Sequence, residues 1–379
     1  MIISANVRDY IKKIIKLIKK VEFSFLCNFG QNPQKLSEEQ SRRIINQLTD
    51  NIYIQTVSEN KLKIKYDLMI VVAAYNCEKT IQECVESVLK QETKYSFELV
   101  IVNDGSTDNT GKILSKYTNM SNVKVINQSN KGFSGARNKA LQELDGRYVF
   151  FLDSDDYLPR NDAIEKLLNC AYEKNADIVE GTAFSFFENG KKNRDMTHRY
   201  IGKVKKDTDL YGYPWGKIYR SELFKKIIFP TGLWFEDTLI SMIIYPLAKT
   251  KYIIKDYVYA YRINQNGITH NSRGKSKSID TFIITEELVK LQSDLNLINS
   301  DTEQLFLNQM AMNYMRLKGL DKKVNSAVIV QGLLLYNKYF KSLKMTNDFS
   351  NKQIMLKKSL DDQNLKKVNA ILDCWSYLD

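Results

Sequence analysis

Short apolar runs alternate with helically spaced apolar residues from residue 67 onward. The runs are continuous and rich in β-branched or aromatic residues, which is typical of strands buried on both faces of a sheet. The expected strands span residues 68–74, 98–102, 123–126 and 148–152, and the expected helices span 80–91, 135–144 and a segment from about residue 110. Because strands that alternate with helices form βαβ units, the pattern predicts an α/β domain with a mostly parallel sheet flanked by helices.

The pattern changes on both sides of this region. All five prolines lie at or before Pro246, and the chain after residue 278 shows helical periodicity. We therefore expect a helical C-terminal domain over residues 278–379, an α/β domain over 67–277, and a polar, helical N-terminal extension over 1–66.

Residues 1–21 predict a basic amphipathic helix. Apolar residues recur at helical spacing from Val7 to Val21, and lysines such as Lys12 and Lys16 fill the other face. Such a helix suits the surface of an anionic bilayer. It equally suits packing on the protein's own core or on a second subunit. Both interpretations stay open, and with them a homo-oligomer built on this helix or on the helical tail.

The charge balance favours an anionic partner. The chain has 56 Lys and Arg against 44 Asp and Glu, a net charge of +12, which suits nucleic acid, a membrane surface or a phosphorylated substrate. No nucleic-acid-binding motif accompanies the charge, so nucleic acid is not expected. The five cysteines are scattered without a CxxC pair, and no apolar run reaches the roughly 18–20 residues of a membrane span. We expect a cytoplasmic protein, with a peripheral position at the inner face of the cell membrane as an extension of that expectation.

Polar residues follow three of the predicted strands at the point where each ends. They are Tyr75-Asn76, the segment 103–106, and the acidic cluster Asp153-Ser154-Asp155-Asp156. Ligands of parallel sheets bind at this edge, and an Asp-x-Asp pair there can hold a hard divalent cation together with phosphate oxygens. The alternative is a polar turn that caps the next helix.

Four segments in register, VVAAYN (71–76), VNDGSTD (102–108), GFSGARN (132–138) and LDSDD (152–156), resemble glycosyltransferase family 2. The resemblance implies the GT-A fold, which is Rossmann-like, and an inverting transfer of a sugar from a UDP-sugar donor. The implied acceptor is a hydroxyl of a cell-surface glycan, teichoic acid, lipid-linked oligosaccharide or glycoprotein. Because the Gln-x-x-Arg-Trp motif of processive synthases is missing, we expect non-processive transfer.

The resemblance also implies roles for residues along the edge of the sheet. The nucleotide-sugar would be bound by Ala74, Tyr75, Glu78, Asp104, Lys131, Arg137, Asp153, Ser154 and Asp155. Asp153 and Asp155 would hold Mn²⁺ or Mg²⁺, and His270 lies where many GT-A enzymes place a late histidine on the metal or diphosphate. A lone histidine is also common as a structural residue, and Arg262 is a further candidate for a diphosphate contact.

The family places its base in a downstream Glu-Asp pair, which Glu236-Asp237 matches. Asp237 would take the proton of the acceptor hydroxyl, while Glu236 would bind the acceptor or serve as the base instead. Trp215, Lys217 and Trp234 resemble acceptor-side residues, although Trp215 also fits a place in the core. The contrasting hypothesis is a non-catalytic GT-A-like subunit that binds nucleotide-sugar or acts as a scaffold in a glycan assembly complex.

Overall fold

A computed structural model describes residues 22–27, 33–49, 54–264, 272 and 274–378 of the chain. The chain forms two compact units: Tyr53–Gly267 is one, and Met1–Ile52 together with Ile268–Asp379 is the other. The segment before the sheet is thus grouped with the C-terminal helices by its contacts. The domain boundaries at 66/67 and 277/278 stay predictions, and the amphipathic helix expected over 1–21 lies outside the described residues.

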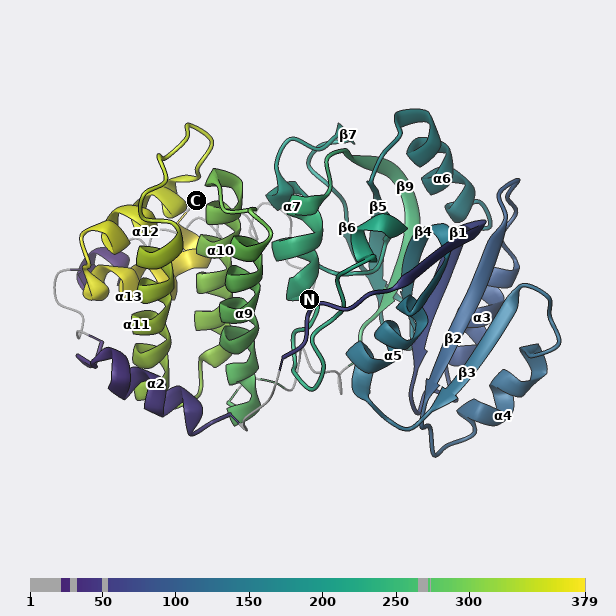
Figure 1. Cartoon of the computed structure of the whole chain (residues 1–379), viewed down its shortest axis with the longest axis horizontal. Helices are drawn as coiled ribbons and strands as arrows, with labels where there is room; N and C mark the ends of the chain where they lie inside the picture. The colour runs from purple at the N-terminus through teal and green to yellow at the C-terminus, as the bar shows by residue number, and fades with distance from the viewer. Residues whose placement is uncertain (1–21, 28–32, 50–53, 265–271, 273, 379) are drawn as a thin grey trace, which may run out of the picture. The chain divides into compact units, whose positions relative to one another are not determined.

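The α/β unit is built on a nine-stranded mixed sheet (Figure 1). Its strands run in the order β3-β2-β1-β4-β8-β5-β9-β7, with β6 paired to β5. They span β1 Lys61–Ala74, β2 Phe97–Asp104, β3 Val123–Gln128, β4 Glu143–Asp153, β5 Ile178–Phe186, β6 Lys192–Met196, β7 Gly202–Lys203, β8 Lys217–Arg220 and β9 Lys251–Arg262. The first four strands pair in parallel, whereas β8 runs antiparallel to both β4 and β5.

Helices link the parallel strands, as the apolar pattern predicted. They are α3 Ile81–Leu89, α4 Thr110–Leu114, α5 Gly132–Leu141 and α6 Ala163–Lys174, followed later by a π-helical turn (η4, Ile240–Ile244) that runs into α7 Tyr245–Leu247. The central strands are buried on both faces, since Ile70 and Val72 on one face of β1 are 0% exposed and Val71 on the other face is 1% exposed. Removing this apolar surface from water is the main force that stabilises the sheet.

Two strands begin earlier than their apolar runs. The first part of β1 carries Lys61, Lys63 and Lys65, which are exposed, and it pairs only with the start of β4. That start of β4, from Glu143, overlaps the helix expected over 135–144. The start of β1 is largely exposed, and the start of β4, although buried apart from Glu143 and Arg147, carries few apolar side chains, so neither gives the apolar signal of a buried strand.

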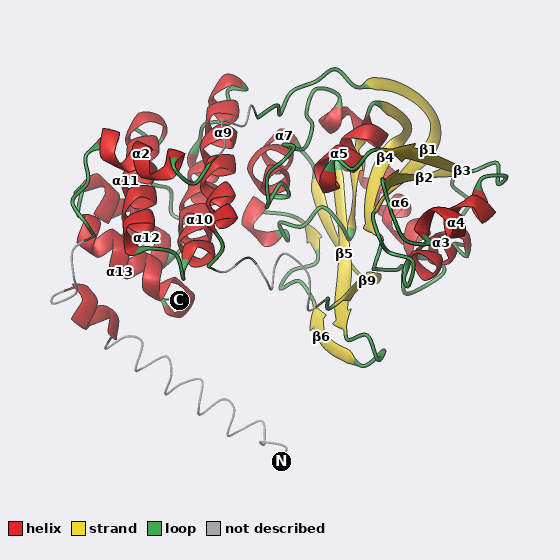
Figure 2. Cartoon of the chain, turned by 90° about the horizontal axis from the view of Figure 1, so that it is seen from below, coloured by secondary structure: helices red, strands yellow, loops and turns green. Residues whose placement is uncertain are grey.

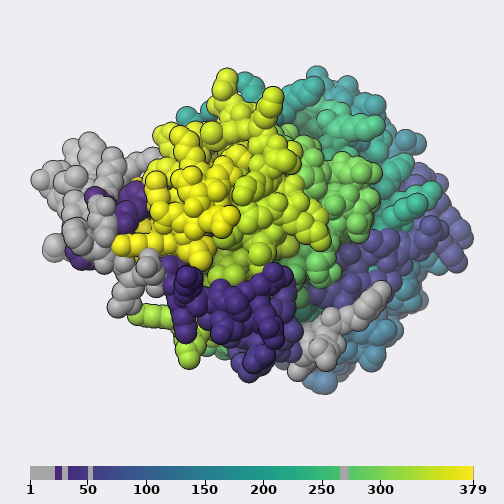
Figure 3. Space-filling model, turned by 60° about the vertical axis from the view of Figure 1, so that its left-hand side comes forward, coloured from purple at the N-terminus to yellow at the C-terminus, as the bar shows by residue number. Residues whose placement is uncertain are grey.

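The other unit is helical (Figure 2). Its described helices include α2 Glu38–Asn46, α9 Asp280–Asp294, α10 Ser300–Leu317, α11 Lys322–Tyr339, α12 Asn351–Asp361 and α13 Leu365–Cys374. Helix α2 lies against the C-terminal helices in the space-filling view (Figure 3). Arg42 of α2 donates two hydrogen bonds to Glu286 of α9, at 2.7 and 2.5 Å, and a third to Gln331 of α11 at 2.6 Å. Among the described residues, no helix is both long and apolar enough to cross a bilayer.

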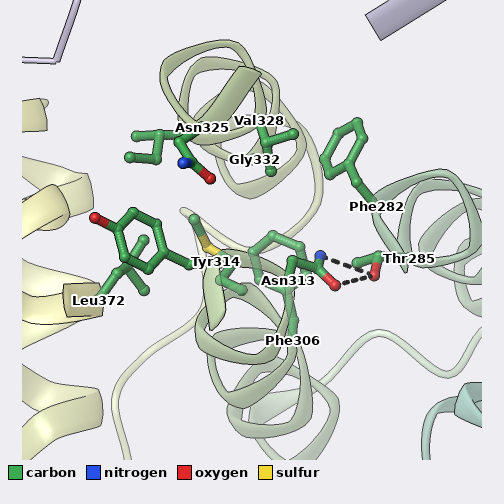
Figure 4. Close-up of a pocket in the computed structure, with 11 residues that line it drawn as sticks. Phe282, Thr285, Phe306, Asn313, Tyr314, Asn325, Val328, Gly332 and Leu372 are labelled. Carbon is green, nitrogen blue, oxygen red and sulfur yellow. Dashed lines mark hydrogen bonds between the residues drawn. The ribbon is translucent and has the colours of Figure 1, made fainter. Parts of the chain in front are cut away.

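A small cavity lies among the helices of this unit (Figure 4). Asn313 and Thr285 hydrogen-bond each other along its wall, with Asn313 Nδ2 donating to Thr285 Oγ1 at 3.0 Å. The remaining lining is largely apolar, including Phe282, Phe306 and Leu372. The cavity has space for about one water molecule, so it is a packing defect of the helical core and not a substrate site.

Candidate active site

The sheet brings the predicted donor residues to one edge. Ala73 of β1 is in register with Asp153 of β4, and Ala74 is in register with Asn103 of β2. Since the carboxyl ends of parallel strands meet at the same edge, Ala74, Asp104 and Asp153 lie together as expected. Each sits at the last position of its strand.

Asp104 organises the loop that follows β3. It is 2% exposed, and its Oδ1 accepts hydrogen bonds from Gln128 Nε2 at 2.7 Å and from the Lys131 backbone N–H at 2.9 Å. The neighbouring Gly105 has φ +74°, and a Cβ there would lie 2.8 Å from the backbone nitrogen of Asn130. Only glycine allows this close approach without strain. The Lys131 side chain is exposed.

Glu78 and Tyr75 occupy the loop after β1 in different ways. Glu78 Oε2 accepts hydrogen bonds from the backbone N–H and side-chain Nδ2 of Asn109, at 2.9 and 2.8 Å. Its own backbone N–H donates to Asp108 Oδ2 at 3.1 Å. Tyr75, in contrast, is 47% exposed. Glu78 therefore fixes two loops to each other, while Tyr75 presents a ring at the surface beside them.

The three carboxylates after β4 have different surroundings. Asp153 pairs with Arg137 at 2.9 Å. Burial, and then the negative charge of Asp153, raise the pKa of Asp155 to about 6. Asp156 is 1% exposed, and burial followed by the charges of Asp155 and Asp153 raises its pKa well above the usual range. Ser154 is buried between them.

Asp156 faces β9 and anchors the acidic loop there. Its Oδ2 accepts from the Tyr259 hydroxyl at 2.7 Å, and its Oδ1 accepts from the Arg262 N–H at 2.6 Å. The same Tyr259 oxygen accepts the Asp153 N–H at 3.1 Å. Arg262 Nε donates to the Asp155 carbonyl at 2.7 Å, and its guanidinium pairs with Glu83. Tyr259 was not identified from the sequence, where it is one of several tyrosines in β9.

Asp153 and Asp155 are the two carboxylates that the sequence predicted to hold a cation, and Asp153 is already paired with Arg137. Across the described part of the chain, no group of three or more His, Cys, Asp and Glu side chains is arranged to hold a metal ion. His270 lies outside the described residues. A divalent cation here would therefore need further oxygen ligands, such as those of a diphosphate.

Arg137 joins the acidic loop to the predicted base segment. It is buried, with 5% of its side chain exposed, and its two terminal nitrogens contact Asp153 at 2.9 Å and Glu236 at 2.8 Å. The guanidinium also lies over the Phe229 ring, 5.4 Å from its centroid. Burial disfavours the charged guanidinium, but Asp153 and Glu236 more than offset this and raise the pKa of Arg137. The partners are 16 and 99 residues away in sequence.

The Glu236-Asp237 segment starts from a strained backbone. Phe235 has φ +67°, a left-handed conformation that a bulky residue adopts at an energetic cost. The following turn is fixed by the Thr238 and Ile240 N–H groups, which donate to the carbonyls of Phe235 and Asp237 at 3.1 and 2.9 Å. The pKa of Glu236 is raised, mainly by burial. The charge of Arg137 offsets part of this rise, and the charge of Asp237 adds to it. Asp237 is partly exposed.

The predicted acceptor residues differ in exposure. Lys217 is fully buried, and its Nζ donates to the carbonyls of Tyr211 and Tyr213 at 2.7 and 2.9 Å. Its ammonium also lies 3.3 Å from Glu180, and burial lowers its pKa. Trp215 is 5% exposed, in agreement with the core placement that the sequence left open, whereas Trp234 is partly exposed. Any part that Lys217 has in acceptor binding must act through the loop it holds.

The fold and the acidic edge of its sheet define a class of α/β protein that binds its ligand at the strand ends. The profile of Glycosyl transferase family 2 matches residues 69–229. Glycosyltransferase GlyG of Streptococcus pneumoniae is 31% identical over 256 residues, which is 63% of this chain and 83% of GlyG. The chain belongs to glycosyl transferase family 2, a family of sugar-transferring enzymes, and the predicted family is confirmed.

Other relatives are longer than this chain. Glycosyltransferase GlyA of the same bacterium is 31% identical over 221 residues, and these cover 53% of this chain but 31% of GlyA. The chain therefore spans about a third of this relative's length. The poly(ribitol-phosphate) β-N-acetylglucosaminyltransferase TarS of Staphylococcus aureus is 29% identical over 319 residues, which is 80% of this chain and 48% of TarS.

Solved structures agree on the fold. A crystal structure of TarS residues 1–349 in complex with UDP-GlcNAc superposes with a TM-score of 0.54 at 20% identity, covering 82% of this chain and 91% of that one. The likeness confirms the GT-A fold, with its mostly parallel sheet and flanking helices.

Proposed function

We propose that this family 2 glycosyltransferase moves a sugar from a UDP-sugar to a hydroxyl of a cell-wall glycan, with inversion and without processivity. The names of two relatives describe sugar transfer to poly(ribitol-phosphate), and the TarS complex contains UDP-GlcNAc. The observation that carries the proposal is the pair of ion pairs made by Arg137, which joins the donor-side carboxylate Asp153 to the Glu236-Asp237 segment. Donor and base chemistry would thus meet at one place in the fold.

The donor would lie along the edge formed by β1, β2 and β4. Asp104 and its loop would receive the nucleoside, and Tyr75 would offer its exposed ring beside it. The ties made by Glu78 and Asp108 would hold the walls of this site. Lys131, exposed at the start of α5, would reach phosphate oxygens as a mobile cation.

Asp153 and Asp155 would hold Mn²⁺ or Mg²⁺ when the donor binds. The raised pKa of Asp155 beside Asp153 indicates two carboxylates that repel each other in a dry place. A divalent cation relieves that repulsion, and carboxylate oxygens are the ligands such cations prefer. When bound, the cation would stabilise negative charge on the departing diphosphate.

Asp237 would be the base. Glu236 is engaged with Arg137, and both carboxylates are partly exposed. The resemblance to the family favours Asp237 as the base. A single displacement in which one carboxylate takes the proton of the attacking hydroxyl inverts the anomeric centre. Arg137 would keep Glu236 ionised and fixed, so that Asp237 keeps its place relative to Asp153.

The test is UDP release from a panel of UDP-sugars, with and without Mn²⁺, by the wild-type protein and by Asp153→Asn. The proposal predicts metal-dependent UDP release from one donor and its loss in Asp153→Asn. UDP binding without UDP release from any donor, in the presence of cell-wall glycan, would favour the non-catalytic subunit instead.

A further inference from the structure

Four aromatic rings stack into a ladder beside the acidic loop. Trp215 is parallel to Tyr213 (4.7 Å between ring centroids, 4° between planes), to Tyr259 (4.5 Å, 12°) and to Tyr261 (5.4 Å, 15°). We call these four rings the aromatic ladder. They come from β9 and from the loop that leads into β8.

One end of the ladder is tied to the donor-side carboxylates. The Tyr259 hydroxyl accepts the Asp153 N–H and donates to Asp156, so the ring next to Trp215 is fixed to the acidic loop. Burial, and then the charges of Asp156, Asp155 and Asp153, raise the pKa of Tyr261, a second ring on Trp215. The ladder therefore starts within hydrogen-bond distance of the loop that would hold the diphosphate.

The other end reaches the surface. Within the ladder, whose residues are all described, Tyr213 is 39% exposed while Trp215 is 5% and Tyr259 is 0% exposed. Tyr213 is thus the most exposed ring of the ladder; Tyr261 is partly exposed, and the Tyr211 ring lies 6.3 Å from Tyr213 at an interplanar angle of 24°. Tyr213 was not identified as a site residue from the sequence, which pointed instead to Trp215, two residues later and buried.

Buried groups hold Tyr213 in place. The Lys217 ammonium donates hydrogen bonds to the Tyr211 and Tyr213 carbonyls, and the Tyr219 hydroxyl donates to the Pro214 carbonyl at 2.9 Å. Gly216 has φ +74°, which allows the chain to turn between Trp215 and Lys217. A ring fixed this way loses little conformational entropy when a ligand covers it, which favours binding.

We propose that Tyr213 is the contact surface for the acceptor and that the acceptor presents a pyranose ring there. This inference rests on the proposed function. A flat aromatic ring buries the C–H face of a pyranose well, because both surfaces are rigid and apolar. Ribitol phosphate is an open chain with no such face, so a glycan acceptor fits Tyr213 better than bare poly(ribitol-phosphate) does.

The experiment measures acceptor binding without turnover, by saturation-transfer NMR and titration on the full chain. The probes are methyl β-pyranosides and β-linked disaccharides of glucose, N-acetylglucosamine, galactose and mannose, with oligo(ribitol phosphate) as the competing probe. We expect at least one pyranoside to bind the wild-type protein, and Tyr213→Ala to weaken that binding about tenfold. Tyr213→Phe keeps the ring and should bind as the wild type does.

Tyr200→Ala is the matched control, because Tyr200 is 54% exposed in the same unit and lies outside the ladder. Loss of pyranoside binding in Tyr213→Ala but not in Tyr200→Ala would support the inference. Equal binding by Tyr213→Ala, preference for oligo(ribitol phosphate), or no pyranoside binding by the wild type would overturn it. UDP titration of the same samples tests the donor site separately, so failure of the proposed function and failure of this inference are distinguishable.

Discussion

The proposed donor side and the proposed acceptor side of the candidate site are built from different chemical groups. On the donor side, carboxylates and backbone groups at the ends of β1, β2 and β4 hold one another, as Asp104 and Glu78 do. On the acceptor side, stacked rings and the buried Lys217 set the surface. The donor side follows from the topology of a parallel sheet, whereas the acceptor side depends on side-chain packing between segments far apart in sequence.

Arg137 contacts both Asp153 and Glu236, so its replacement should have the largest effect on stability and on sugar transfer. Arg137→Ala leaves Asp153 and Glu236 without their cation in a buried place and should lower the free energy of unfolding by about 3–5 kcal/mol, along with sugar transfer. Urea denaturation and UDP release measure the two effects. Arg137→Lys keeps the positive charge but cannot contact Asp153 and Glu236 with two separate guanidinium nitrogens. Its stability and UDP-release rate should lie between those of the wild type and Arg137→Ala.

Arg220→Ala is a useful control for Arg137, because Arg220 pairs with Asp177 at 2.8 Å away from the carboxyl edge of β4. This variant should lose some stability and keep the UDP-release rate per folded molecule. A similar loss of that rate in both variants would mean that the Arg137 network has no special part in the site.

Asp155 gives the donor side a distinct pH dependence. Its pKa is raised to about 6 by burial and by Asp153, so the folded protein binds this proton more tightly than the unfolded chain does. This group therefore stabilises the fold at low pH and loses that contribution as the pH rises from about 4 to 6, by on the order of 2–3 kcal/mol. The difference in unfolding free energy between wild type and Asp155→Asn, measured without metal from pH 4 to 7, should follow this slope.

Asp195→Asn provides a control of opposite sign for that titration. The pKa of Asp195 is lowered by hydrogen bonds from Lys192 and Tyr257, so its stabilising contribution is lost as the pH falls through its folded pKa. If the difference in unfolding free energy between the wild type and Asp155→Asn did not change with pH, the claim that burial and Asp153 raise the pKa of Asp155 would be contradicted.

Tyr259→Phe tests the link between the two sides with a smaller change. It removes one hydroxyl and leaves the Asp156 carboxylate and the Asp153 N–H short of a partner, which should cost about 1–3 kcal/mol of stability. Tyr257→Phe removes a hydroxyl from an exposed position on the same strand, where Tyr257 donates to Asp195, and should change stability by about 0.5 kcal/mol or less. Equal losses of stability in the two variants would mean that the Tyr259 hydroxyl does not couple the aromatic ladder to the acidic loop.

Tyr75→Ala should have the smallest effect. The ring is 47% exposed, so its removal should leave the unfolding free energy within about 0.5 kcal/mol. UDP affinity should fall about two- to fivefold, since one partly exposed ring contributes little to a site held mainly by polar groups. A larger loss, seen by calorimetric titration, would mean that the donor side also depends on aromatic contact.

The sequence predicted the strands that carry the proposed donor residues, because buried parallel strands are apolar throughout and their ends carry short polar motifs. The strands expected at 68–74, 98–102, 123–126 and 148–152 all lie within β1 to β4. The exposed start of β1 and the polar, mostly buried start of β4 carry no such signal. The family resemblance added which polar ends belong to the site.

The contacts that organise the site could not be predicted in this way. The pairing of Arg137 with Glu236 spans 99 residues, and the turn of Asp156 toward Tyr259 spans 103. Neither contact produces a periodic pattern in the sequence, because each depends on how loops fold over the sheet. The same holds for the burial of Trp215 and Lys217, which places the exposed ring at Tyr213 instead.

The central claim is that Asp237 takes the proton of the acceptor hydroxyl while Glu236 is held by Arg137. The most direct measurement compares UDP release and UDP affinity for Asp237→Asn and Glu236→Gln with the wild type, using a donor that the wild-type protein accepts. We expect Asp237→Asn to lower turnover by about 10²–10⁴-fold with UDP affinity unchanged, and Glu236→Gln to lower it less. Wild-type turnover in Asp237→Asn, or a larger loss in Glu236→Gln, would contradict the assignment.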